Sequence, residues 1–105
     1  MSSKSVGYAR PEGGIGLFVV GELALGNQNK VSRPTSNEYL PPGTHSCHAL
    51  GTIHPDPKDD FLVDKDVTVP NGKPVPQAGG GMCANEFVIY NKNQVKLRYI
   101  VKWKM

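Results

Sequence analysis

A nearly continuous apolar run occupies residues 15–25, with the sequence IGLFVVGELAL. Its length fits a single strand, and apolar side chains at consecutive positions indicate a strand that is covered on both faces. Gly16 and Gly21 within the run would allow neighbouring groups to approach the backbone closely. The run therefore predicts a central strand that needs apolar partners on two sides, which is the strictest demand this sequence makes on its fold.

The rest of the chain offers few segments that could supply this cover. Of its 105 residues 38% are hydrophobic, and 12 Gly and 9 Pro point to short strands joined by many turns. A helix end is expected over residues 2–9, stopped by Pro11, and no other helix is predicted. We therefore expect an α+β, strand-dominated chain that holds only part of a domain.

Between these landmarks the sequence alternates brief apolar segments with turn-forming residues. Short strands are expected at residues 45–51, 61–63 and 67–69. The connections are expected to be a turn at 12–14, a long polar connection at 26–42, a rigid loop at 54–60, a turn at Asn71-Gly72 and a flexible loop at 76–84.

Two apolar segments close the chain, at residues 85–90 and 94–103, and the turn-like residues 91–93 between them predict a terminal β-hairpin. Glu86 begins the first strand, directly before Phe87. A carboxylate in this place is unusual for a purely structural strand and would suit a group that contacts a substrate. The alternative is a glutamate at a strand end that faces water, and the residues alone favour it.

The net charge of +3 is small, and its basic residues gather only near the C-terminus. Most of these share the face of the last strand opposite its apolar side chains. They are Lys96, Arg98, Lys102 and Lys104. Nucleic-acid binding would need closer clustering and aromatic side chains on the same face, so a solvated strand face is the favoured interpretation.

The sequence favours a soluble intracellular protein. Residues 1–5 lack the apolar core of a signal peptide, and no apolar run approaches the ~20 residues that span a bilayer. Because nothing indicates secretion, Cys47 and Cys83 are expected to be free thiols. The candidates for a metal site are His45, Cys47, His48 and His54, but their spacing matches no known ligand pattern, so they are interpreted as loop residues.

Several segments, in one order and at compatible spacing, resemble the C-terminal half of a poly(ADP-ribose) polymerase (PARP) catalytic domain. The resemblance is closest to the small nuclear members that respond to DNA damage. The segments are Ser3-Lys4-Ser5 with Tyr8, Gly21-Glu22-Leu23-Ala24-Leu25-Gly26, residues 42–46 with Leu50-Gly51, Pro55-Asp56-Pro57, and residues 85–90 with 94–99. The resemblance implies antiparallel sheets and a terminal hairpin of the ADP-ribosyltransferase fold.

The resemblance also implies a reaction, in which NAD⁺ loses nicotinamide and its ADP-ribose passes to a protein side chain or a growing polymer. It assigns the catalytic carboxylate to Glu86, which would stabilise positive charge on the ribose, orient the sugar and polarise an acceptor hydroxyl. It places Lys4 beside that carboxylate, and Ser5 and Tyr8 in the nicotinamide pocket, where Tyr8 would stack on the pyridinium ring. Without the resemblance, these three residues read as an ordinary helix end.

Two features differ from the family. Its His-Gly pair and its Gly-x-Tyr-Phe strand lie upstream of the segment that resembles residue 1, and neither occurs here. We therefore expect residues 1–105 to be a partial PARP catalytic domain without its N-terminal half, with little turnover alone. Glu86 is compatible with a polymer product, but the loop at 76–84 is shorter and richer in glycine than in polymerising members, which would limit the product to single ADP-ribose units.

The implied partners are NAD⁺ as substrate and acceptor proteins, with no metal and no membrane. DNA would be bound only through domains outside this sequence, and the implied location is the nucleus. The alternative function is a catalytically inactive fragment or an interaction half-domain, which would bind another chain through its uncovered apolar surface.

Overall fold

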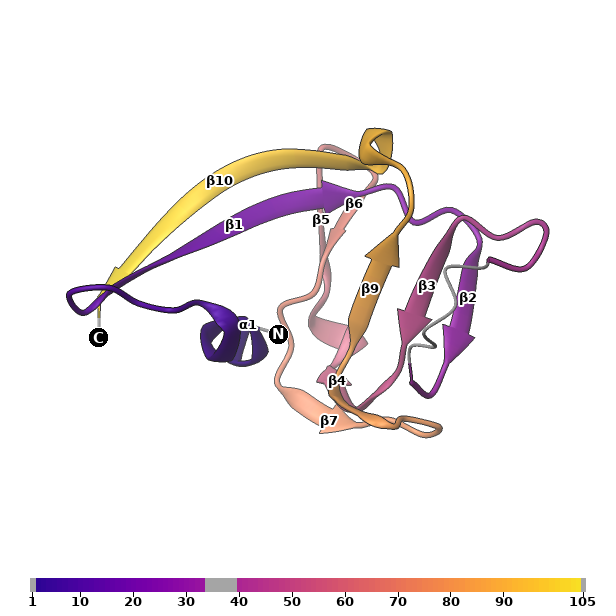
Figure 1. Cartoon of the computed structure of the whole chain (residues 1–105). Coiled ribbons are helices and arrows are strands. Elements are labelled where there is room, and N and C mark those ends of the chain that lie inside the picture. Colours follow the sequence, from indigo (N-terminus) through magenta and orange to yellow (C-terminus); the bar gives the residue numbers. More distant parts are fainter. Residues whose placement is uncertain (1, 34–39, 105) are drawn as a thin grey trace.

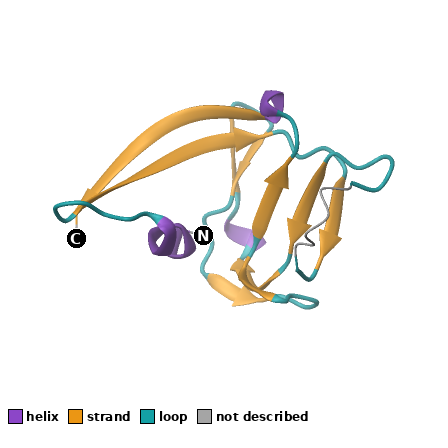
Figure 2. Ribbon diagram, viewed as in Figure 1, coloured by secondary structure: helices purple, strands orange, loops and turns teal. Residues whose placement is uncertain are grey.

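The computed structural model describes residues 2–33 and 40–104, so the expectations that involve Met1 and residues 34–39 lie outside the described chain. Strands dominate the structure (Figure 2). The described residues contain one α-helix, α1 (Ser2–Tyr8). The expected α+β, strand-dominated class is confirmed, as is the short helix before Pro11. No helix in the described part of the chain is long and apolar enough to cross a membrane.

One three-stranded sheet contains most of the buried residues. Its central strand β3 (Ser46–Ala49) runs parallel to β2 (Gln28–Val31) and antiparallel to β9 (Glu86–Ile89) (Figure 1). All four residues of β3 are buried. The strand expected within 45–51 is therefore confirmed, and it is the centre of the core.

The connection predicted at 26–42 was wrong in part, because it contains β2. This strand carries polar side chains and has the alternating exposure of a sheet edge. A polar segment of this kind has little strand propensity of its own. It is a strand here because β3 lies beside it and supplies hydrogen-bonding partners.

A second three-stranded sheet has β4 (Gly51–Pro55) at its centre, with β7 (Pro74–Pro76) antiparallel and β8 (Met82–Ala84) parallel to it. The loops predicted at 54–60 and 76–84 therefore need correction. β4 continues to Pro55 before a 3₁₀ turn at Pro57–Asp59, and β8 occupies the end of the supposed flexible loop. No turn forms at Asn71-Gly72.

The remaining predicted short strands form a separate two-stranded sheet. β5 (Phe61–Val63) pairs antiparallel with β6 (Val67–Val69), which confirms both strands. The connection between them contains Asp64 and Lys65, each with a positive φ, of 52° and 76°. Non-glycine residues rarely adopt this backbone region, so the tip of this hairpin is a strained turn.

The apolar run forms β1 (Ile15–Leu23), which pairs antiparallel with β10 (Val95–Lys104). These two strands make a long two-stranded ribbon that arches away from the other sheets (Figure 1). The prediction of a central strand was wrong, because β10 is the only strand beside β1 in the described chain. Close approach at Gly16 is confirmed, since the ring of Trp103 fills the space that a side chain would need.

The predicted terminal hairpin was also wrong. β9 pairs with β3, and β10 pairs with β1, so the two apolar segments are separate strands in separate sheets. A 3₁₀ turn at Lys92–Gln94 lies between them. The side-chain amide of Gln94 accepts from the N–H groups of Tyr90 and Asn91 and donates to the carbonyls of Ala24 and His45. These contacts direct the chain toward β1 instead of back along β9.

Candidate functional site

The strand β9 begins with Glu86, the predicted catalytic carboxylate, and α1 brings Lys4 beside it. Lys4 Nζ lies 3.9 Å from Glu86 Oε1 and donates a hydrogen bond of 3.3 Å to the carbonyl of Ala84. The lysine side chain is 20% exposed and the carboxylate 39%. A half-buried ammonium therefore lies next to a carboxylate that solvent, or a substrate, can still reach.

The two residues predicted to bind nicotinamide lie on the same helix as Lys4. Ser5 and Tyr8 are three residues apart, so they share one face of α1. Both are exposed, and Tyr8 retains 79% of its surface in contact with solvent. Within the described residues neither side chain has a hydrogen bond to Glu86. The structure thus brings Lys4 to the carboxylate and leaves Ser5 and Tyr8 open.

A cavity of ≈ 430 Å³ adjoins the strand that carries Glu86. Side chains alternate along a strand, so Phe87 and Glu86 point to opposite faces of β9, and the cavity lies on the Phe87 face. Its lining combines three prolines with polar groups. The lining residues are Ser2, His54, Pro55, Pro57, Asp60, Pro70, Asn85 and Phe87.

His48 lies beside Phe87 on the same face of the sheet, because the two residues are paired in register. It lies in β3, is 8% exposed, and its ring stacks on Phe87 with 4.3 Å between the ring centroids. Burial lowers the pKa of His48, and the nearby charges of Lys30 and His54 act in the same direction, while the neighbouring side chain of Asn85 opposes them. A lowered pKa favours the neutral imidazole at physiological pH.

The interpretation of the histidines and Cys47 as loop residues was wrong for three of them. Cys47 and His48 belong to β3, and His54 belongs to β4. Four consecutive buried residues give no alternating pattern, so the sequence of residues 46–49 predicts a short strand without showing that Cys47 and His48 are buried in it. Both cysteines are free thiols, as expected. Within the described residues no group of three or more His, Cys, Asp or Glu side chains could hold a metal ion.

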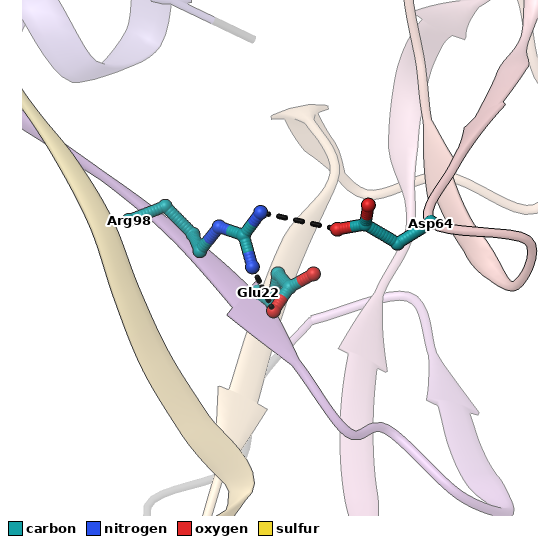
Figure 3. Close-up of polar contacts among 3 residues, drawn as sticks. All are labelled: Glu22, Asp64 and Arg98. Carbon is teal, nitrogen blue, oxygen red and sulfur yellow. Dashed lines mark hydrogen bonds and ion pairs between the residues drawn. The ribbon is translucent and has the colours of Figure 1, made fainter.

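Sequence reasoning missed the role of Arg98, which was expected on a solvated basic face. Its guanidinium points toward two carboxylates and forms ion pairs with Glu22, at 3.3 Å, and Asp64, at 3.2 Å (Figure 3). The side chain is 27% exposed. Arg98 therefore links the β1–β10 ribbon to the strained tip of the β5–β6 hairpin.

A β-bulge explains why Arg98 points this way. Val20 pairs with Tyr99 and Gly21 pairs with Leu97, so Arg98 is the extra residue on β10. A bulge bends its strand and redirects the unpaired side chain. The register of two paired strands decides where a bulge occurs, and the sequence of β10 alone does not reveal that register.

Comparison with known proteins gives a consistent result. The family model "Poly(ADP-ribose) polymerase catalytic domain" matches residues 1–105. Poly(ADP-ribose) polymerase 1 of Xenopus laevis is 36% identical over 107 residues, which cover 99% of this chain and 11% of the relative. Poly(ADP-ribose) polymerase 2 of Arabidopsis thaliana is 35% identical over 109 residues, covering 99% of this chain and 17% of the relative.

A mono-transferase also aligns. Protein mono-ADP-ribosyltransferase PARP3 of Homo sapiens is 35% identical over 97 residues, covering 84% of this chain and 18% of that protein. The chain thus spans less than a fifth of the length of each of these relatives.

Proposed function

Since this chain belongs to the poly(ADP-ribose) polymerase catalytic domain family, we propose that it forms the part of an NAD⁺ ADP-ribosyltransferase that carries the catalytic carboxylate, Glu86. The reaction breaks the bond between nicotinamide and ribose, and the bonding electron pair leaves with nicotinamide. An acceptor atom of a protein, or of bound ADP-ribose, then forms the new bond to the ribose carbon.

The observation that carries this proposal is the placement of Glu86 next to Lys4. Loss of nicotinamide leaves positive charge on the ribose, which a fixed carboxylate stabilises. The same carboxylate can hold a ribose hydroxyl in place and accept the proton of the acceptor hydroxyl. Lys4, held by the carbonyl of Ala84, orients the carboxylate without covering it. A strand is a rigid support for this chemistry.

In this proposal α1 forms one wall of the nicotinamide pocket. The Ser5 hydroxyl can hydrogen-bond the carboxamide of nicotinamide, and the Tyr8 ring can stack on the pyridinium face, where a cation–π interaction adds about 0.5–2 kcal/mol. The exposure of Tyr8 supports this role, because the ring face is free to receive a ligand.

We propose further that residues 1–105 are the C-terminal half of the catalytic domain, and that its N-terminal half packs on the β1–β10 ribbon. The supporting observation is the exposure of apolar side chains along the ribbon, among them Leu17 at 59%, Leu97 at 70% and Ile100 at 74%. Exposed apolar surface of this extent marks an interaction site. An interaction half-domain without turnover is the alternative that the same surface would serve.

The proposals for substrate, acceptors and cellular role follow from membership of the family. We propose NAD⁺ as the substrate without a metal, proteins as the acceptors, and a nuclear role in the response to DNA damage, with DNA bound by other domains. For the product we propose single ADP-ribose units, because the connection before Glu86 is short and β8 occupies its end.

The test is the substitution Glu86→Gln in the natural polypeptide that carries this chain, with nicotinamide release from NAD⁺ as the measurement. We expect loss of activity, because the amide cannot stabilise the ribose cation as a carboxylate does. Glu12→Gln is the matched control, because Glu12 is an exposed glutamate distant from Glu86 in the sequence, and this variant should retain activity. Equal activity of the two variants would contradict the proposal and favour the interaction half-domain.

A further inference from the structure

Glu86 begins its strand directly after a corner where the chain passes from one sheet to the other. Ala84, the last residue of β8, pairs with Ile53 of β4, whereas Glu86 pairs with Ala49 of β3. The single residue between them is Asn85. The direction in which β9 leaves this corner therefore decides where the carboxylate of Glu86 lies.

A closed set of hydrogen bonds holds the corner. Asn85 Oδ1 accepts from the N–H of Gly51 at 2.9 Å and from Gln77 Nε2 at 2.7 Å. Gln77 Nε2 also donates to the carbonyl of Gly51 at 2.8 Å. The backbone N–H of Gln77 donates to the carbonyl of Thr52 at 2.8 Å, which fixes Gln77 itself against β4. The side chain of Gln77 thus joins β4 to Asn85, at the point where the chain changes sheet.

The backbone around these amides is packed without space for larger side chains. A Cβ atom at Gly51 would overlap the backbone of Ala84, and a Cβ atom at Gly80 would overlap the backbone of Gly51. Contacts this close leave little room for the corner to shift while its hydrogen bonds remain. Loss of the Gln77 bonds would leave the acceptor of Asn85 and the carbonyl of Gly51 short of a donor.

We propose that Gln77 is a positioning residue for Glu86, acting through Asn85. The proposal deepens the function proposed above and rests on it. The side chain of Gln77 bonds to Gly51 and Asn85, and it sets the geometry of the carboxylate by fixing the residue before Glu86. Transfer reactions depend strongly on geometry, and a displacement of about 1 Å at a catalytic group costs roughly a hundredfold in rate.

The chain offers a matched control for a purely structural role. Gln94, like Gln77, donates two hydrogen bonds through Nε2, here to the carbonyls of Ala24 and His45, and it lies away from the corner. Gln77→Glu and Gln94→Glu keep the shape of the side chain and replace its donor with an acceptor. Each variant should lose comparable hydrogen bonding, but only Gln77→Glu should disturb Glu86.

The first measurement is nicotinamide release by the natural polypeptide that carries this chain. Gln77→Glu should lower kcat about ten- to a hundredfold with an unchanged KM for NAD⁺, and Gln94→Glu should leave kcat unchanged. Equal losses in the two variants, or a raised KM with an unchanged kcat for Gln77→Glu, would overturn the proposal.

A second measurement tests the positioning role of Gln77 independently of the proposed transfer reaction. In NMR spectra, Gln77→Glu should shift the backbone amide signal of Glu86 and speed its hydrogen exchange, whereas Gln94→Glu should not. If Glu86→Gln retains full activity, the assigned reaction is wrong, and the NMR result still decides whether Gln77 positions Glu86. An unmoved Glu86 signal in Gln77→Glu would refute the positioning role whatever the activity.

Discussion

The corner around Asn85 and the β1–β10 ribbon are both built from strands, but they are stabilised in opposite ways. At the corner the residues are small and their backbones touch, with Ala49 fully buried and Ala84 2% exposed. On the ribbon the side chains are large and apolar, yet Leu97 and Ile100 remain mostly exposed. Apolar content therefore does not locate the core of this chain. Small side chains and closed backbone contacts do.

The polar contacts of the two regions differ in the same way. The corner is held by neutral amide groups at 2.7–2.9 Å. The ribbon is joined to the β5–β6 hairpin through the charged Arg98, at 3.2–3.3 Å. Hydrogen bonds between neutral groups are insensitive to salt, whereas ion pairs near the surface are screened by it. The corner that precedes Glu86 is therefore expected to be less sensitive to salt than the contact between the ribbon and the hairpin.

The largest effect is expected from an added methyl group at the corner. Gly51→Ala should lower the free energy of unfolding by about 3 kcal/mol, because its Cβ overlaps the backbone of Ala84. On the ribbon, Gly21→Ala places its Cβ 3.2 Å from the carbonyl of Lys96 and should cost only about 0.5 kcal/mol. Chemical denaturation of both variants measures the difference, and equal losses would remove the distinction between the regions.

An intermediate effect is expected at His48, where burial lowers the pKa. Below the unfolded value of 6.5, the unfolded chain binds a proton that the folded chain resists, so stability falls as the pH falls. His48→Gln should flatten this decline, and His45→Gln, at an exposed position, should keep it. Denaturation midpoints measured from neutral pH downward test this. A decline that persists unchanged in His48→Gln would show that the buried imidazole is not its source.

The smallest effect is expected at the ribbon's ion pairs. The carboxylate of Asp64 raises the pKa of Arg98, as does the charge of Glu22, so the guanidinium is always charged. Arg98→Met should lower the melting temperature slightly at low ionic strength and not at about 1 M salt, where the Debye length falls to roughly 3 Å. Lys102→Met, on the same strand, is the control. A fall in melting temperature that is independent of salt would mean that Arg98 stabilises the ribbon through packing of its side chain and not through its ion pairs.

Local predictions succeeded where each segment carries its own signal. The helix at Ser2–Tyr8 ends before a proline, and the short strands β5, which is apolar, and β6, which is β-branched, lie on either side of a polar turn. The predicted pairing of the last two strands is wrong, because proximity in sequence does not make β9 and β10 partners. The four bonds of the Gln94 side chain redirect the chain between β9 and β10, and nothing in the spacing of the apolar residues announces them.

The site shows the same division. The resemblance named Glu86, Lys4, Ser5 and Tyr8 as a set, and the fold places Lys4 3.9 Å from Glu86 although 82 positions separate them in the sequence. The resemblance did not reveal Gln77, because a glutamine in a glycine-rich loop looks like any polar loop residue. Its importance follows only from the two sheets that meet beside it.

The sequence by itself determined the family of this chain, its strand-dominated class and the carboxylate at the start of β9, because these depend on residue types and on their order. The tertiary structure decided which strands pair, where the core lies, and which side chains hold Glu86 in place. Those properties depend on contacts between segments distant in sequence, such as Gln77 with Gly51 and Arg98 with Asp64. Such contacts arise from backbone packing and register, which no local pattern of side chains encodes.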